Sequence, residues 1–113
     1  MKNNYCFYVR YFSERTKKEQ INQMLDFIQE NNIPIKNTFY FEDYAKGSTQ
    51  AREGLNQLLE LAYNGEFTRL VVLIPQILHI DHYEYKKIEQ DLMNYGINII
   101  KLVGEDAEID IQG

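Results

Sequence analysis

Small and hydroxyl-bearing residues stand just before an arginine near the middle of the chain. Gly47, Ser48 and Thr49 precede Arg52, which opens an amphipathic segment. A helix N-terminus presents free backbone N–H groups, and a guanidinium can bind an oxyanion in a bidentate manner, so this stretch is suited to binding a phosphate. Turn formation and helix capping explain the three small residues equally well without a ligand. Residue types alone leave both interpretations open.

A second candidate group lies in the first apolar segment, residues 5–12 (YCFYVRYF). Arg10 is the charged residue in this aromatic run, and a charge on an apolar strand needs a partner. Ser13 follows the run and offers a hydroxyl that could act as a nucleophile. Cys6 lies within the run and is more simply explained as a packed core thiol than as a nucleophile.

A third group contains residue types that can bind metals. His79, Asp81, His82 and Glu84 fall within six positions. Asp81 and Glu84 are already explained as the cap of a following helix, and no second ligand cluster stands elsewhere in the sequence. We therefore predict neither a metal site nor a cofactor.

These candidates depend on the elements that position them. Apolar runs predict strands, and apolar residues at helical spacing predict helices between them. The predicted elements, in chain order, are a strand over 5–12, a helix over about 17–31 capped by Thr16 and Glu19, a strand over 35–41, a helix from the Gly/Ser loop to about 63 with Gly65 as its stop, a strand over 69–74, a helix from the Asp81 cap to Gly96, a strand over 97–103 and a candidate edge strand at 108–111.

The alternation predicts a three-layer αβα fold with a mainly parallel sheet of four or five strands. Right-handed crossovers place helices on both faces of such a sheet, and we expect the strand order of flavodoxin-like proteins. Ligands bind at the carboxyl ends of the strands in these folds. The three loops near Ser13, at 43–52 and at 75–81 should therefore meet at one edge.

Composition limits the classes of function. The 113 residues support one domain over 1–113, and a single cysteine excludes an intramolecular disulfide. No apolar run reaches membrane-spanning length and no signal peptide is visible at the start, so we expect a cytoplasmic protein without a membrane partner. The net charge of −5 disfavours autonomous nucleic-acid binding. Any DNA contact must be local or supplied by a partner.

The sequence motif around Arg52 resembles that of a known protein family. Asp43, Gly47, Ser48 and the run 52–55 (REGL) match the pattern D-x-x-x-G-S-x-x-x-R-E-G-L. The chain thus resembles the catalytic domain of the serine recombinases, the resolvase/invertase family. That resemblance implies a resolvase-like fold and a reaction in which a serine hydroxyl attacks a DNA phosphodiester and becomes a phosphoserine. It implies that Arg10 and Arg52 act in catalysis with Ser13 as a shifted nucleophile, and that Ser48 and Gln20 bind phosphate.

The same comparison reveals departures from the family pattern. The family's first strand ends Tyr-x-Arg-x-Ser, whereas this chain has Phe12 at the serine position and Ser13 one residue later. The family's Leu-Asp-Arg-Leu-Gly-Arg loop is replaced here, with Pro75, Gln76 and His79 at the positions of the aspartate and the two arginines. Removing one preorganised donor from a developing oxyanion can slow a reaction a hundredfold or more, so these positions predict a degenerate site.

Two functional hypotheses follow. The first is a resolvase-like domain related to site-specific DNA recombination that is catalytically impaired and acts as a protein-interaction or regulatory module. The second is an active recombinase catalytic domain that uses Ser13 as a shifted nucleophile. Family members continue into a dimerisation helix and a DNA-binding domain, and we expect none in this sequence. The expected partners are a second copy or an intact recombinase, with DNA bound only weakly or through parts outside this chain.

Overall fold

Strands and helices alternate along the chain, as the apolar patterns predict. The computed structural model describes residues 4–45, 52–73 and 82–103. The elements within them are β1 (Tyr5–Tyr11), α1 (Glu14–Glu30), the 3-10 helix η1 (Ile35–Asn37), β2 (Thr38–Tyr44), α2 (Glu53–Tyr63), β3 (Arg69–Val72), α3 (His82–Asn94) and β4 (Asn98–Lys101). The candidate edge strand at 108–111 lies outside the described residues.

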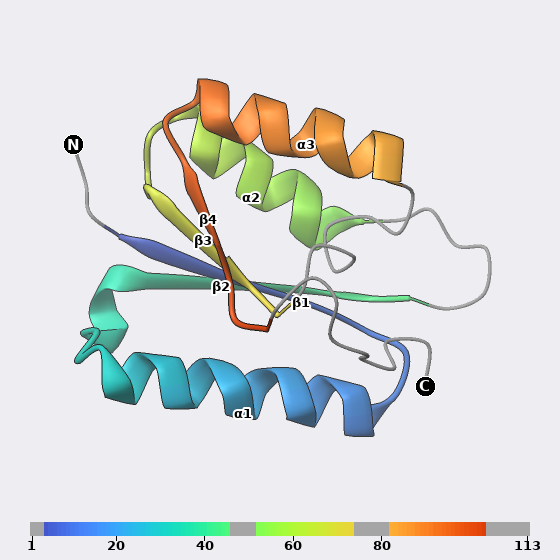
Figure 1. Ribbon diagram of the computed structural model, residues 1–113, viewed down its shortest axis with the longest axis vertical. Helices are drawn as coiled ribbons and strands as arrows, with labels where there is room; N and C mark the ends of the chain where they lie inside the picture. The colour runs from blue at the N-terminus through green and yellow to red at the C-terminus, as the bar shows by residue number, and fades with distance from the viewer. Residues whose placement is uncertain (1–3, 46–51, 74–81, 104–113) are drawn as a thin grey trace.

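The four strands form one parallel sheet in the order β2-β1-β3-β4. Helix α1 covers one face, and α2 and α3 cover the other (Figure 1). This arrangement confirms the predicted αβα layers and the flavodoxin-like strand order. Strand β1 is central, and it pairs with β2 over all seven of its residues.

The core lies on both faces of the sheet. Alternate residues of β1 separate between the two faces, with Cys6 and Tyr8 packing in the cluster under α2 and α3, and Phe7 and Val9 packing toward α1. Residues 70–72 of β3 are fully buried. Burial on both faces explains why the β3 segment reads as an uninterrupted apolar run.

Strand β2 begins three residues later than predicted. Pro34 has φ −66°, and the following residues form η1 instead of a strand. The Thr38 hydroxyl donates a 2.7 Å hydrogen bond to the Ile35 carbonyl, which closes this turn. The Ile35 side chain is 64% exposed, so its apolar character misled the sequence-based prediction.

The predicted helix stops are confirmed at two glycines. Gly65 and Gly96 follow α2 and α3 with φ of +73° and +84°, values that favour glycine. Among the described helices, none is both long and apolar enough to cross a membrane. The cytoplasmic location stays a prediction.

Candidate functional site

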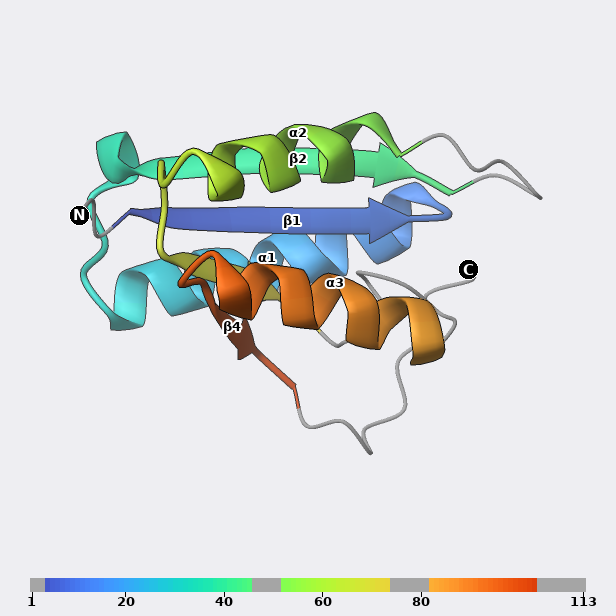
Figure 2. The same ribbon diagram turned by 90° about the horizontal axis from the view of Figure 1, so that it is seen from above.

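The C-terminal ends of β1 and β2 bring the candidate residues together. Tyr8 and Arg10 are two residues apart in β1 and therefore share a face of the sheet. The parallel register places Asp43 of β2 beside Arg10. Figure 2 shows α2 running along β2, with its first turn at the carboxyl ends of the strands. Arg52, just before that turn, thus joins the group.

Asp43 caps α2 from the neighbouring strand. Its carboxylate accepts hydrogen bonds from the backbone N–H groups of Gly54 at 2.8 Å and Leu55 at 2.9 Å. The residue at the helix's own N-cap position, Arg52, makes no side-chain cap. A carboxylate at this position satisfies two free N–H groups and interacts favourably with the helix dipole. Asp43 is therefore a structural anchor of the site.

Gly54 allows this close contact between α2 and β2. A Cβ atom on Gly54 would lie 2.6 Å from the Glu42 carbonyl oxygen and 3.1 Å from a carboxylate oxygen of Asp43. The first distance is shorter than real Cβ contacts allow. The glycine of the REGL run is thus explained by the approach of the helix to the strand.

The Tyr8 hydroxyl joins Asp43 to Arg52. It donates a 2.6 Å hydrogen bond to Asp43 Oδ2 and accepts one of 2.9 Å from Arg52 Nη2. Burial raises the pKa of Tyr8 well above its ordinary value, so the hydroxyl stays protonated and able to donate. The Arg52 guanidinium carbon also lies 5.7 Å from the centre of the Tyr8 ring. The two contacts hold the guanidinium at the edge of the sheet.

Arg10 provides the second positive charge. Burial lowers the pKa of Arg10, and the neighbouring charge of Arg52 lowers it further, while Tyr8 and Asp43 act in the opposite direction. A guanidinium nevertheless remains protonated in proteins. Its central carbon lies 5.8 Å from the centre of the Phe12 ring. Phe12, the residue that follows β1, therefore contacts the arginine near the end of that strand.

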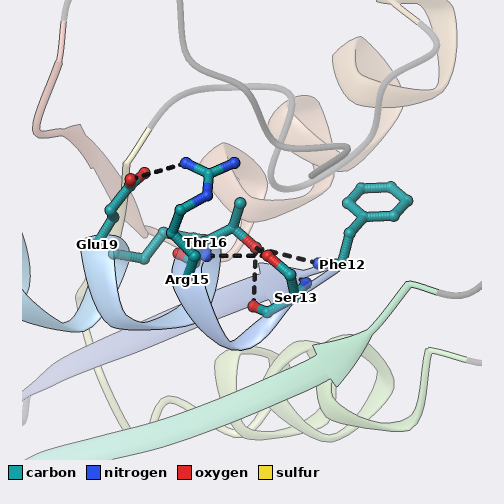
Figure 3. Close-up of polar contacts among 6 residues, drawn as sticks. Phe12, Ser13, Arg15, Thr16 and Glu19 are labelled. Atoms are coloured by element: carbon teal, nitrogen blue, oxygen red, sulfur yellow. Dashed lines mark hydrogen bonds and ion pairs between the residues drawn. The ribbon is translucent and has the colours of Figure 1, made fainter.

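Ser13 caps α1. Its hydroxyl accepts the backbone N–H of Thr16 at 3.2 Å, and the Thr16 hydroxyl accepts the backbone N–H of Ser13 at 3.1 Å. Figure 3 shows this reciprocal capping box, with the Phe12 ring projecting away from it. The predicted capping box of Thr16 and Glu19 is wrong, because Ser13 is the N-cap residue and α1 begins at Glu14. Glu19 instead binds Arg15 at 2.9 Å.

Gln20 ties α1 to the end of β1. Its amide nitrogen donates to the carbonyls of Arg10 at 2.8 Å and Thr16 at 3.2 Å. The side chain is 1% exposed, and within the described part of the chain its carbonyl oxygen has no hydrogen-bond partner. A phosphate-binding role for Gln20 stays a prediction.

The other predicted site residues lie outside the described residues. These are Ser48 of the Gly/Ser loop and the three degenerate positions Pro75, Gln76 and His79. Across residues 4–45, 52–73 and 82–103, no three metal-binding side chains gather into a cluster. The structure therefore describes only the part of the candidate site that is formed by β1, β2 and the start of α2.

A second polar cluster on the α1 side of β2 was missed from the sequence. Glu42 accepts hydrogen bonds from Tyr40 at 2.8 Å, Lys17 at 3.0 Å and Tyr11 at 3.2 Å. Burial alone would raise the pKa of Glu42, but these three bonds outweigh it and hold the pKa below its ordinary value. The members lie up to 31 residues apart, so only the alternation of strand residues could have suggested the cluster.

Comparisons with known proteins place these features in context. A family model described as the N-terminal domain of resolvase matches residues 5–112. No curated protein sequence gives a significant match.

Solved structures share the fold, and three of them are described here. The C-terminal catalytic domain of ISC1926 TnpA, an IS607-like serine recombinase, superposes with a TM-score of 0.76 at 19% identity, over 93% of this chain and 71% of that one. A resolvase family site-specific recombinase from Streptococcus pneumoniae gives 0.75 at 18%, over 89% and 72%. A serine recombinase from Sulfolobus solfataricus gives 0.70 at 24%, over 95% and 73%.

Proposed function

The chain belongs to the resolvase family, because it matches the N-terminal domain of that family, and we propose that it is a recombination-related module in which DNA cleavage is impaired. In this proposal the domain acts through protein interaction or regulation and not through its own phosphoserine chemistry. Two features of the described part of the site support this proposal. The Ser13 hydroxyl caps a helix, and the two arginines of the family pattern, Arg10 and Arg52, are present.

The observation that carries the proposal is the role of Ser13. Its hydroxyl accepts the Thr16 N–H and lies 3.3 Å from the Thr16 hydroxyl, so it serves the start of α1. Phe12 follows the last residue of β1, packs against the same core cluster as Tyr8 and contacts the Arg10 guanidinium. A phenyl ring has no group that can attack phosphorus. The residue beside the arginine thus lacks a nucleophile, and the nearest hydroxyl belongs to a helix cap.

The retained arginines support phosphate contact without turnover. Arg52 is held by Tyr8, and Asp43 anchors both the Tyr8 hydroxyl and the start of α2. Such a preorganised guanidinium can bind a DNA phosphate oxygen. With a net charge of −5, the whole chain opposes DNA binding, so this contact needs a partner that supplies affinity. We propose a second copy or an intact recombinase as that partner.

A covalent trapping experiment tests the proposal. The chain is incubated with a nicked suicide DNA substrate, alone and with an active serine recombinase, and protein–DNA adducts are resolved on denaturing gels. We expect no adduct to this chain, and a dose-dependent change in the adduct yield of the active recombinase. Arg52→Gln should reduce that change, whereas Gln57→Ala on the exposed side of α2 should not.

The alternative function, an active recombinase domain with Ser13 as the shifted nucleophile, predicts a different result. A covalent adduct that forms with the chain alone and disappears in Ser13→Ala would overturn the impaired-enzyme proposal. Circular dichroism of Ser13→Ala must first show a folded protein, because loss of the cap is expected to cost about 1 kcal/mol. Absence of any effect on the partner recombinase would remove the regulatory part of the proposal.

A further inference from the structure

We propose that the open edge of β2, with the apolar groove beside it, binds an extended segment of a partner protein as an added strand of the sheet. The partner segment carries apolar side chains at alternate positions and one carboxylate. The proposal goes beyond the proposed function, because the groove lies on the α1 side of the sheet, whereas Tyr8 and Arg52 lie on the α2 side.

Strand β2 is an edge strand without the features that usually protect such an edge (Figure 2). Among the strands that the structure describes, it pairs only with β1, and this pairing runs through seven consecutive residues without a bulge. The strand sequence, TFYFEDY, contains no proline and no lysine. Natural proteins use bulges, prolines and lysines to keep edge strands from pairing with other chains. The edge of β2 is therefore suited to accept a further strand.

The backbone of β2 presents hydrogen-bonding groups on its open side. The N–H group of Ala45, just after β2, donates a 2.8 Å hydrogen bond to the Tyr11 carbonyl of β1. Successive strand residues direct their N–H and C=O groups to opposite sides, so Tyr40, Glu42 and Tyr44 direct theirs away from β1. Each of these three residues offers one donor and one acceptor that an added strand can satisfy.

An apolar groove lies beside this edge on the α1 side. It forms a cavity of about 220 Å³, and its lining residues from α1, η1 and β2 include Ile21, Leu25, Ile28, Ile35, Thr38 and Tyr40. Leu25 is 52% exposed and Tyr40 is 45% exposed, so apolar surface is available to a partner. A strand added at β2 directs every second side chain toward α1. Apolar residues at alternate positions of the partner would therefore enter the groove.

Lys18 adds a positive charge next to the apolar groove. A neighbouring cavity is lined by Glu14, Lys17, Lys18 and Ile21, and it shares Ile21 with the groove. Lys17 is bound to Glu42 at 3.0 Å, whereas Lys18 forms no ion pair with any residue that the structure describes. Glu14 opposes a second negative charge at this position. The local charges thus match one carboxylate of a partner.

Other occupants fit this surface less well than a peptide strand of a different protein. A phosphodiester backbone has hydrogen-bond acceptors only, so it cannot satisfy the carbonyl groups on the open side of β2. In a second copy, the Glu42 carboxylate of β2 is already bound by Lys17, and Asp43 is bound by the start of α2. The β2 strand of a second copy therefore has no free carboxylate to offer Lys18.

Peptide binding measured by fluorescence anisotropy tests the proposal. The full chain is titrated with a labelled seven-residue peptide in which two isoleucines and, near the carboxyl end, one glutamate alternate with threonines. A second peptide has the same composition, but its isoleucines and glutamate are adjacent. We expect the alternating peptide to bind about tenfold more tightly, the factor that burial of one further apolar side chain provides.

Methylation of the peptide backbone tests strand pairing directly. The glutamate must lie near Lys18, toward the end of β2, so the peptide should run parallel to β2. In that direction the threonine N–H groups face β2, and the isoleucine N–H groups face solvent. N-methylation of the threonines should abolish binding, and N-methylation of the isoleucines should leave it unchanged. Equal affinity of the two methylated peptides would overturn the added strand.

Variants of the chain locate the binding surface. Leu25→Glu and Ile35→Glu place a charge in the groove at exposed positions, so each should fold and bind the alternating peptide about tenfold more weakly. Met93→Glu, at a methionine of α3 that is 60% exposed, is the matched control and should leave the affinity unchanged. Lys18→Glu should weaken binding about two- to fivefold, and it should favour a peptide with lysine in place of glutamate.

Contrary results separate the possible occupants. Wild-type affinity in both Leu25→Glu and Ile35→Glu, or equal affinity for the two peptide sequences, would overturn the proposal. Sedimentation velocity of the chain alone tests self-association: a dimer that Leu25→Glu abolishes and Met93→Glu keeps would make a second copy the occupant and overturn the proposed partner. If the alternating peptide binds as expected but the chain does not change the adduct yield of an active recombinase, the regulatory part of the proposed function falls while this surface stands.

Discussion

The Tyr8 hydroxyl forms hydrogen bonds with two charged side chains through one oxygen atom. It donates to the Asp43 carboxylate and accepts from the Arg52 guanidinium, and the side chain is fully buried. Sequence reasoning named Asp43 and Arg52 from the family pattern but could not place Tyr8 between them, because the Tyr8–Asp43 bond spans 35 positions. The position of Tyr8 between Asp43 and Arg52 depends on the pairing of β1 with β2 and on the packing of α2 against β2.

Tyr8→Phe should destabilise the fold and loosen Arg52. Removing the hydroxyl deletes two hydrogen bonds to charged groups at a buried position, so we expect the free energy of unfolding to fall by about 2 kcal/mol. Urea denaturation measures this loss. Tyr63→Phe, at a side chain that is 73% exposed, is the matched control and should change stability by less than about 0.5 kcal/mol. Equal effects of the two substitutions would contradict the bridging role of Tyr8.

Glu42→Gln should alter how stability depends on pH. The pKa of Glu42 is lowered in the folded state, so the ionised carboxylate contributes stability above the unfolded pKa, about 4.3. That contribution is lost as the pH falls through the lower folded pKa. The wild type should therefore be more stable than Glu42→Gln at about pH 7, and the difference should shrink by about pH 3. A difference that grows with acid would contradict the assignment.

At the scale of elements, α2 and β2 are held at close range by Gly54. Replacing a helical glycine by alanine normally stabilises a helix by about 1 kcal/mol. Gly54→Ala should have the opposite sign, because its Cβ would lie 2.6 Å from the Glu42 carbonyl oxygen and would force the helix away from the strand. We expect a net loss of about 1–2 kcal/mol in urea denaturation. Asn56→Ala, exposed on the same helix, is the control and should be neutral or slightly stabilising. A stabilised Gly54→Ala would rule out the close contact.

The elements themselves were largely predictable, whereas their ends were not. An aromatic run with one arginine marked β1, an apolar run marked β3, and Gly65 and Gly96 marked the ends of α2 and α3, where the structure gives both glycines a positive φ. The start of α1 was misplaced because Ser13 and Thr16 are both good capping residues and the local sequence does not rank them. The start of β2 was misplaced because Ile35 is apolar yet exposed. Both errors concern the ends of elements, where the local sequence permits more than one boundary.

At the scale of the whole molecule, Cys6 lies at the centre of the sheet. Its side chain is 0% exposed in the central strand, and burial raises the pKa of the thiol far above its ordinary value. A reactive thiolate should therefore form only when the sheet opens. We expect thiol-labelling rates under native conditions to give an opening free energy equal to the global unfolding free energy from urea. Labelling of unfolded chain in urea is the control, and markedly faster native labelling would mean that β1 opens locally.

The central position of β1 has a consequence during protein synthesis. The aromatic strand Tyr5–Tyr11 is made before both of its partners, β2 and β3, which begin at Thr38 and Arg69. At typical translation rates of about 5–20 residues per second, about 1 to 5 s separate the end of β1 from the start of β2. During this interval the nascent chain carries a segment of high β-propensity and low charge with no strand to pair with. Among the described strands, β1 is thus the one that must wait for both of its partners during synthesis.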